Sequence, residues 1–212
     1  MEIAIIGAGS VGGALGTNWA ARGHRITYGV GQVDDPKHEA LRRQGSGRVG
    51  FSSPAEAAAG HRVIVLAVPW DAAQAALGAL AGKLLIDCTN PLGTTRQGLG
   101  LVVGFEESGG ERIAGWAAGA SVFKTLNQTG FGVMAEPRRY SPPPAMFVAG
   151  AAGPDKTLVL GLVGELGFEA VDAGPLDAAR LLEPLAMLWI NLALKRGLGR
   201  DFAFGLVRPA QP

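Results

Sequence analysis

Cysteine is nearly absent from this chain of 212 residues, and that scarcity excludes one class of protein. A single cysteine, Cys88, cannot form a disulfide within the chain, so a small secreted domain held by disulfides is excluded. No such cross-link is needed, because a chain of this length can bury about 70% of its unfolded surface on folding. We therefore expect one large domain, or one main domain with a small appendage, in a reducing compartment.

An excess of charge of either sign is also missing. The chain has 19 Lys and Arg against 18 Asp and Glu, which gives a net charge of +1. This balance provides no electrostatic attraction to nucleic acid or to an anionic membrane, so neither is expected as a partner. The longest apolar segments are residues 63–70 and 181–194. The first is too short to span a bilayer, and the second is interrupted by Glu183, Pro184 and Asn191, so we expect a soluble, cytoplasmic protein.

Glycine, in contrast, is abundant, with 33 residues. Many of them lie next to apolar runs, as is typical of tight turns between alternating strands and helices. Apolar runs rich in β-branched residues predict strands over residues 2–6, 25–29, 48–52, 62–68, 83–88, 121–126, 145–150 and 168–174. Segments with helical spacing lie between them, over residues 11–23, 35–45, 54–60, 70–80, 110–119 and 154–167. Apolar strands that alternate with helices predict an α/β fold with a doubly wound, mostly parallel sheet of the Rossmann type.

The periodicity also predicts how the chain is divided. Residues 1–140 form a dinucleotide-binding Rossmann domain, and residues 141–212 form a small C-terminal β-α-β unit with a helical extension. The tail of this extension has more apolar side chains than one helix face can bury against a small sheet, so we predict a homodimer contact there. The apolar residues concerned are Leu181, Leu182, Leu185, Leu188, Trp189, Leu192 and Leu194.

The strongest motif is the turn GAGSVG at residues 7–12, which matches G-x-G-x-x-G. It directly follows the first strand and opens a helix, which is the context in which this pattern binds the pyrophosphate of a dinucleotide. Gly7 allows the tight turn, Gly9 lets the pyrophosphate approach the backbone, and Gly12 lets the helix pack closely on the strand. The alternative is a structural turn without a ligand. We predict that the whole turn binds a cofactor: Gly7, Ala8, Gly9, Ser10, Val11 and Gly12.

The end of the second strand, where such folds distinguish NAD from NADP, carries neither of the usual residues. An acidic residue there binds the ribose of NAD, and an arginine binds the 2′-phosphate of NADP. This chain has Val30-Gly31-Gln32 instead, and we predict that these residues contact the cofactor and that Lys37 supplies the missing cation. Asp34 and Asp35 are interpreted as acids of a first helical turn. NADP is still expected over NAD, but by a smaller margin than an arginine would give. A charge-assisted hydrogen bond is worth roughly 1.5–3 kcal/mol, and its absence leaves a preference of about tenfold.

Two further segments end strands at the same edge of the predicted sheet. Residues 67–70 end the fourth strand, and residues 87–93 end the fifth. Either segment could be an ordinary turn, but together they would line one crevice with the glycine turn, and residues 124–130 would reach it too. The candidate cofactor contacts on the first two segments are Ala67, Val68, Pro69, Trp70, Asn90 and Pro91.

Recognisable acid–base machinery is missing from the sequence. His24, His38 and His61 are interpreted as surface residues. Cys88 is interpreted as buried and structural, because a reactive thiolate needs a positive neighbourhood. No spacing typical of metal ligands occurs, so we predict a cofactor site with no catalytic side chain and no metal.

Several segments together resemble the coenzyme F420-dependent NADP oxidoreductase family, which includes the NADPH:coenzyme F420 reductases. The family is also similar to the oxidoreductase domain of the six-transmembrane metalloreductases. The resemblance covers nearly the whole chain, and the tail after Val171 is its most specific part. The segments that carry it are residues 7–16, 66–70, 87–93, 123–130, 143–150 and 171–204.

The resemblance implies hydride transfer between the nicotinamide of NADP(H) and a deazaflavin, coenzyme F420, or a flavin. Such a reaction needs two stacked rings in a dry crevice and no protein nucleophile. By position, the resemblance places Asn127 beside the nicotinamide ring, with the residues at 67–70 and 90–91 along the nicotinamide half. It also places the acceptor against residues 141–144 and 189–198. The departure from the family pattern is Gly31, where an arginine is usual.

Two alternatives remain open. A non-enzymatic redox sensor that binds NADP would also lack catalytic groups. An imine or short-chain acid reductase of the pyrroline-carboxylate or β-hydroxyacid type would share the glycine turn, but those enzymes append a longer helical domain than the stretch after Val171 provides.

Overall fold

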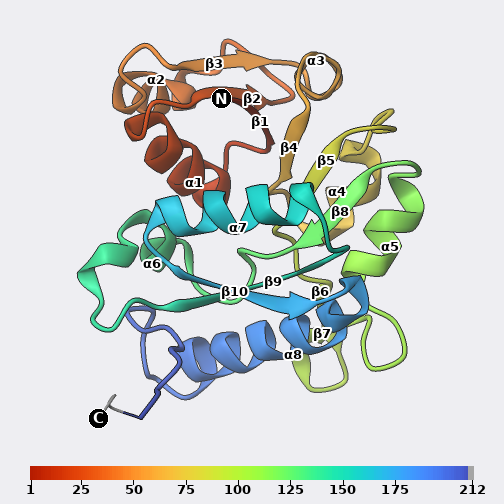
Figure 1. Ribbon diagram of the computed structural model, residues 1–212, viewed down its shortest axis with the longest axis vertical. Helices are drawn as coiled ribbons and strands as arrows, with labels where there is room; N and C mark the ends of the chain where they lie inside the picture. Colours follow the sequence, from red (N-terminus) through yellow and green to blue (C-terminus); the bar gives the residue numbers. More distant parts are fainter. Residues whose placement is uncertain (210–212) are drawn as a thin grey trace.

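The computed structural model describes residues 1–209. Within them, eight strands form one sheet in the order β10-β9-β8-β5-β4-β1-β2-β3, and every neighbouring pair is parallel except β8 and β9. The predicted doubly wound, mostly parallel sheet is therefore confirmed (Figure 1). The strands are β1 (Glu2–Ile6), β2 (Arg25–Gly29), β3 (Val49–Ser52), β4 (Val63–Leu66), β5 (Leu84–Asp87), β8 (Ser121–Lys124), β9 (Ala145–Gly150) and β10 (Glu169–Gly174).

Helices cover both faces of this sheet, because the interior strands carry apolar side chains on both faces. Ile3 and Ile5 of β1 belong to one apolar cluster, whereas Ala4 and Ile6 belong to the other. The first cluster is closed by α1 (Ser10–Ala21), α6 (Phe131–Ala135) and α7 (Pro154–Leu166). The second is closed by α3 (Pro54–Gly60), α4 (Trp70–Ala76) and α5 (Gly109–Trp116). Because both faces are buried, the strands contain continuous apolar runs.

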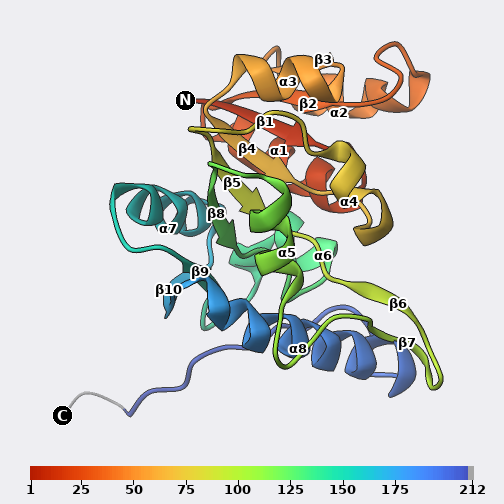
Figure 2. The same cartoon turned by 90° about the vertical axis from the view of Figure 1, so that its right-hand side faces the viewer.

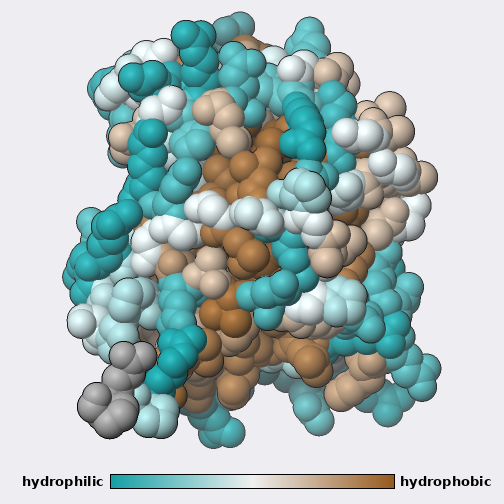
Figure 3. Space-filling view, viewed as in Figure 1, coloured by the Kyte–Doolittle hydropathy of each residue, from teal (hydrophilic) through white to brown (hydrophobic). Residues whose placement is uncertain are grey.

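The C-terminal part extends the same sheet. Strands β9 and β10 are parallel and joined by α7, which is the predicted β-α-β unit. Helix α8 (Ala179–Ile190) continues into a π-helical turn, η4 (Asn191–Lys195). Figure 2 shows α8 as the lowest layer of the molecule, and Figure 3 shows apolar side chains gathered over it. The division of the chain at residue 140 stays a prediction.

Three local predictions are corrected by the structure. The helix expected over residues 70–80 ends at Ala76, and Leu77 already has extended backbone. A two-stranded hairpin, β6 (Leu92–Thr95) with β7 (Gly98–Leu101), was not expected, because these short strands contain glycine and threonine instead of an apolar alternation. Residues 35–45 form two short elements, the 3₁₀ turn η1 (Pro36–His38) and helix α2 (Glu39–Gln44).

The histidine interpretation is wrong for two of the three residues. His24 is buried, and its Nε2 lies 2.7 Å from Oε2 of Glu165. His38 is buried against Phe51. His61 is half-buried, with Nδ1 2.9 Å from the carbonyl oxygen of Ala57. Short-range sequence patterns do not show that a distant carboxylate or aromatic ring will cover an imidazole. Cys88 is buried, as expected.

The remaining short elements connect these layers. Turn η2 (Pro137–Arg139) follows α6, and turn η3 (Leu176–Ala178) precedes α8. None of the helices in residues 1–209 is both long and apolar enough to cross a membrane.

Candidate functional site

The glycine turn has the geometry that its motif predicts. Gly7 has φ +105°, and a Cβ there would lie 2.5 Å from the carbonyl oxygen of Ala67, so only glycine fits. A Cβ on Gly12 would lie 2.0 Å from the carbonyl oxygen of Gly7, which shows how closely α1 packs on β1. Gly9 differs, because a Cβ there would meet no protein atom within 4 Å. The middle of the turn is therefore open on the side that a ligand would approach.

The N-terminus of helix α1 points its free backbone donors into this opening. Gly9 is the N-cap residue, with no side-chain cap, and the first turn has no acidic residue. The first N–H groups of a helix need a partner, and together with the helix dipole they favour an anion. The turn therefore combines open space with free backbone donors, and its binding of a pyrophosphate stays a prediction.

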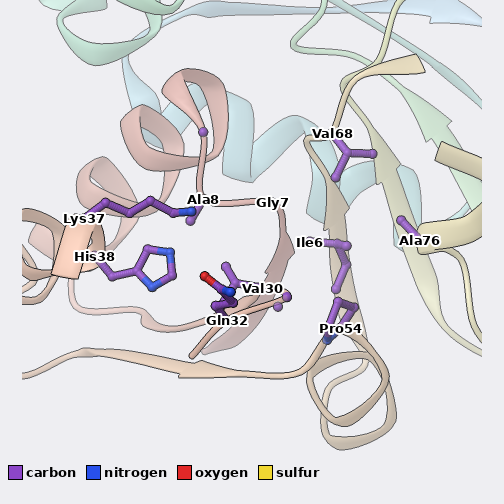
Figure 4. A pocket seen from close by; sticks show the side chains of 13 residues that line it. Ile6, Gly7, Ala8, Val30, Gln32, Lys37, His38, Pro54, Val68 and Ala76 are labelled. Atoms are coloured by element: carbon purple, nitrogen blue, oxygen red, sulfur yellow. The ribbon is translucent and has the colours of Figure 1, made fainter. Parts of the chain in front are cut away.

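A cavity of about 550 Å³ lies beside this turn, at the carboxyl ends of β1 and β2 (Figure 4). Eight of the predicted cofactor residues line it: Gly7, Ala8, Gly9, Val30, Gly31, Gln32, Lys37 and Val68. Five lining residues were not predicted: Ile6, Gly29, His38, Pro54 and Ala76. The cavity thus joins the glycine turn to the strand end where the adenosine ribose binds in dinucleotide folds.

A second cavity, of about 470 Å³, lies next to the first, and Val68 lines both. It is lined by two segments that follow strands β4 and β5, including the predicted residues Pro69, Trp70 and Asn90. Together the two cavities form a crevice along the carboxyl edge of β2, β1, β4 and β5. An extended dinucleotide requires this shape.

The other predicted residues have varied surroundings. Ser10 lines a neighbouring hollow along α1, whereas Val11 and Ala67 pack against the first apolar cluster. Pro91 is buried. The Trp70 ring packs against Trp116 of α5, with 5.4 Å between the ring centroids. Binding by each of these residues stays a prediction.

Two amide side chains meet at the far end of the crevice. Asn90 Nδ2 donates to the backbone oxygen of Asn127 at 2.9 Å, and Asn127 Nδ2 donates to Oδ1 of Asn90 at 2.9 Å. Gln128 Nε2 donates to Oδ1 of Asn127 at 2.7 Å, which fixes that amide from the other side. Leu126 has left-handed backbone, at φ +56°, and turns the chain sharply after β8. The resemblance placed Asn127 beside the nicotinamide ring, and the structure puts it next to Asn90 of the second cavity.

A buried ionic network lies beneath this end of the crevice, and sequence reasoning missed it. Lys124, fully buried at the end of β8, donates to Oδ2 of Asp87 at 2.9 Å and to the carbonyl oxygen of Thr89 at 2.6 Å. Its Nζ also lies 3.0 Å from Oε1 of Glu183 in α8. Burial lowers the pKa of Lys124, but the carboxylates of Asp87 and Glu183 outweigh this effect and raise the pKa above its ordinary value.

The rest of the network is satisfied as well. The backbone N–H groups of Gly109 and Gly110, at the start of α5, donate to Glu183 at 2.8 and 2.9 Å. Thr89 donates to Asp87 through its backbone and its hydroxyl. One lysine thereby ties α8 and α5 to the segment that carries Asn90. The available sequence signal was a charged residue in two otherwise apolar segments, at positions 124 and 183.

The thiol of Cys88, which lines the second cavity, is not activated for nucleophilic chemistry. Burial, together with the charge of Asp87, raises the pKa of the Cys88 thiol, which therefore stays protonated. Residues 1–209 contain no cluster of three or more His, Cys, Asp or Glu side chains that could hold a metal ion.

Trp189, predicted to lie near the acceptor, is held by the protein itself. Its Nε1 donates to the carbonyl oxygen of Phe202 at 2.8 Å, and its ring stacks on Phe202. A Cβ on Gly130 would lie 2.5 Å from the indole, so the tail packs closely on the end of the 124–130 loop. The tail is therefore fixed next to the loop that carries Asn127.

The chain is similar to known reductases over its whole length. Residues 2–91 match the family model described as NADP oxidoreductase, coenzyme F420-dependent. The F420-dependent NADP reductase of Methanothermobacter marburgensis is 28% identical over 218 residues, which cover 92% of this chain and 93% of that protein. A crystal structure of a candidate F420-dependent NADP reductase from Arthrobacter sp. FB24 is 31% identical. It has a TM-score of 0.86 and covers 97% of this chain and 99% of its own.

A more distant likeness concerns the fold alone. A reductive aminase from Aspergillus terreus, solved with NADPH and ethyl levulinate, has 22% identity and a TM-score of 0.66. The match covers 92% of this chain but 62% of the aminase, whose additional length this chain does not share. Because the Arthrobacter structure matches in sequence and fold from end to end, the chain belongs to the coenzyme F420-dependent NADP oxidoreductase family.

Proposed function

We propose that this protein transfers hydride between NADP(H) and a deazaflavin of the coenzyme F420 type or a flavin. The observation that carries the proposal is the pair of neighbouring cavities along one edge of the sheet, with an open glycine turn in the first and Asn90, held by Asn127, in the second. Its relatives named as F420-dependent NADP reductases support the same chemistry.

The lack of an acid–base pair fits this reaction. Hydride leaves the nicotinamide with two electrons and adds directly to the acceptor ring, so no side chain needs to form a covalent bond. The protein has to hold two flat rings at reacting distance and keep water out. Residues 7–12 would bind the pyrophosphate, and Asn90 and Asn127, held by each other and by Gln128, would present rigid amide groups at the nicotinamide end.

The test is NADPH oxidation by the purified protein with coenzyme F420, FMN or FAD as acceptor. We expect F420 or one of the flavins to oxidise NADPH catalytically, with the cofactor absorbance lost only when acceptor and protein are both present. A protein that only senses NADP would bind NADPH but turn over none of the acceptors, and that result would overturn the proposal.

We further propose a homodimer that uses the outer face of α8. Leu182 and Trp189 are buried against the protein, whereas Leu181, Leu188 and Leu194 are exposed, at 72%, 48% and 51%. The apolar surface seen over α8 in Figure 3 is the kind that a second copy covers.

Light scattering at micromolar concentration should give twice the chain mass of 21.8 kDa. The change Leu188→Glu places a charge in this face and is expected to lower the mass to that of one chain. As a control, Ala55→Glu changes an exposed apolar residue of α3, which lies at the opposite end of the molecule from α8 (Figures 1 and 2), and should leave the dimer intact. A wild-type protein with the mass of one chain would contradict the proposal.

A further inference from the structure

The first cavity contains a buried imidazole that the proposed function leaves unused. His38 ends the turn η1, is 2% exposed, and lines the cavity together with Gly31, Gln32 and Lys37. Figure 4 shows its ring on the same side of the cavity as Lys37, facing Gln32. This is the end of β2, where the residue that distinguishes NADP from NAD is usually found.

The ring of His38 is held in a fixed orientation. It stacks on Phe51 of β3, with 4.6 Å between centroids and 10° between the ring planes. The guanidinium of Arg42 lies 4.6 Å from the centre of the same Phe51 ring and donates to the carbonyl oxygen of Val33 at 3.0 Å. The Arg42 guanidinium is therefore held by contacts within the protein, whereas the imidazole of His38 lines the cavity.

One nitrogen of His38 remains available to a ligand. Nδ1 lies 3.4 Å from the carbonyl oxygen of Val33, which can only accept, so the hydrogen belongs on Nδ1 in this contact. Among the described residues, no donor or acceptor is bonded to Nε2. A phosphate oxygen can only accept, so it would bond to this ring through a hydrogen on Nε2.

The positive charge of Lys37 is partly offset by a neighbouring carboxylate. Its Nζ lies 2.7 Å from Oδ2 of Asp35, and its backbone N–H donates to Oδ1 of the same residue at 3.0 Å. These bonds hold the pKa of the Asp35 carboxyl below its ordinary value, so the carboxylate stays charged beside Lys37. That Lys37 replaces the missing arginine stays a prediction, and Asp35 offsets part of the charge that it would offer.

We infer that His38 and Lys37 together form the subsite for the 2′-phosphate of NADP, and that Asp35 weakens it. The inference rests on the proposed function, since it requires the adenosine ribose of NADP to lie at the end of β2. A Cβ on Gly31 would meet no atom within 4 Å, so the backbone is open there, and Gly31, Lys37 and His38 line the same cavity. His38 thus takes the role of the arginine that the family usually has at position 31, and it sets the preference for NADP over NAD.

The test is a set of dissociation constants for NADPH and NADH, measured by calorimetry. His38→Phe keeps an aromatic ring against Phe51 but removes both nitrogens. We expect it to weaken NADPH binding about tenfold or more, the effect of one charge-assisted hydrogen bond, and to leave NADH binding unchanged. His61→Phe is the matched control and should change neither dissociation constant. His61 lies beside the amino-terminal ends of β1, β2 and β3, whereas the first cavity lies at the carboxyl ends of the strands.

A second variant is expected to have the opposite effect on NADPH binding. Asp35→Asn keeps a side chain that can cap the turn but removes the negative charge beside Lys37. It should tighten NADPH binding by up to about fivefold, the upper end of the range for an exposed electrostatic contact, with no gain for NADH. Gly31→Arg restores the usual family residue, and in that background His38→Phe should cost less than it does alone.

The outcomes separate this inference from the proposed function. If His38→Phe weakens both cofactors equally, or neither, His38 does not bind the 2′-phosphate and the inference is overturned. If the wild-type protein prefers NADH, it is overturned as well. If the wild-type protein binds neither cofactor, the proposed function itself fails. Thermal unfolding of each variant shows whether a lost affinity comes from a damaged fold.

Discussion

Replacement of Gly9 by valine is expected to abolish NADPH binding while the protein stays folded. A Cβ at this position meets no protein atom within 4 Å, and the backbone is extended, with φ −75° and ψ −167°, so valine fits the free protein. The same side chain would stand where the pyrophosphate has to approach the first turn of α1. Loss of two charge-assisted hydrogen bonds costs on the order of 3 kcal/mol or more, which weakens binding at least about a hundredfold.

Calorimetry with NADPH and thermal unfolding of the free protein measure the two halves of this prediction separately. Gly12→Val provides the contrast, because a Cβ there lies 2.0 Å from the backbone oxygen of Gly7 and cannot be accommodated without moving α1. That variant should lose about 1–3 kcal/mol or more of folding stability, as overpacked cores do. If Gly9→Val binds NADPH with unchanged affinity, the cofactor lies elsewhere.

Most of the fold could be predicted from the sequence because its rules are local. A strand that is covered on both faces has to be apolar along its whole length, and β1, β4 and β5 have such runs. The glycine turn is local as well, since the clashes that a Cβ would make at Gly7 and Gly12 arise within the β1–α1 unit and its neighbouring strand. The parallel order of strands around this turn then brings the ends of β1, β2 and β4 to one edge.

What could not be predicted depends on partners that are distant in the sequence. The hairpin β6–β7 has little apolar pattern of its own and lies next to α8. His24 is buried because Glu165 of α7 reaches it, and His38 is buried because Phe51 of β3 stacks on it. Part of the site was missed for the same reason. The prediction named Lys37 from its position in the sequence, but only the fold shows that Asp35 pairs with it and that His38 lines the same cavity.

The buried network around Lys124 is the clearest case of such a distant partnership, and it leads to the second large effect. Lys124→Met should destabilise the protein by about 3–5 kcal/mol, the usual cost of removing one partner from a buried ion pair. Methionine fills a similar volume, so the loss comes from leaving the carboxylates of Asp87 and Glu183 without a cation. Urea unfolding of the variant and the wild-type protein measures the difference. Lys37→Met is the matched control, because that lysine is exposed and its pair with Asp35 should contribute little to stability.

A second substitution distinguishes lost charge balance from lost packing. In the Lys124→Met background, Glu183→Gln removes one of the two uncompensated charges but keeps the shape of the side chain. It should therefore recover part of the lost stability, although in the wild-type background the same change destabilises. The opposite signs are expected because a buried carboxylate is costly only while it has no cation beside it. A Lys124→Met protein as stable as the wild type, or a Glu183→Gln effect of the same sign in both backgrounds, would show that this network does not hold α8 and α5 to the Asn90 end of the crevice.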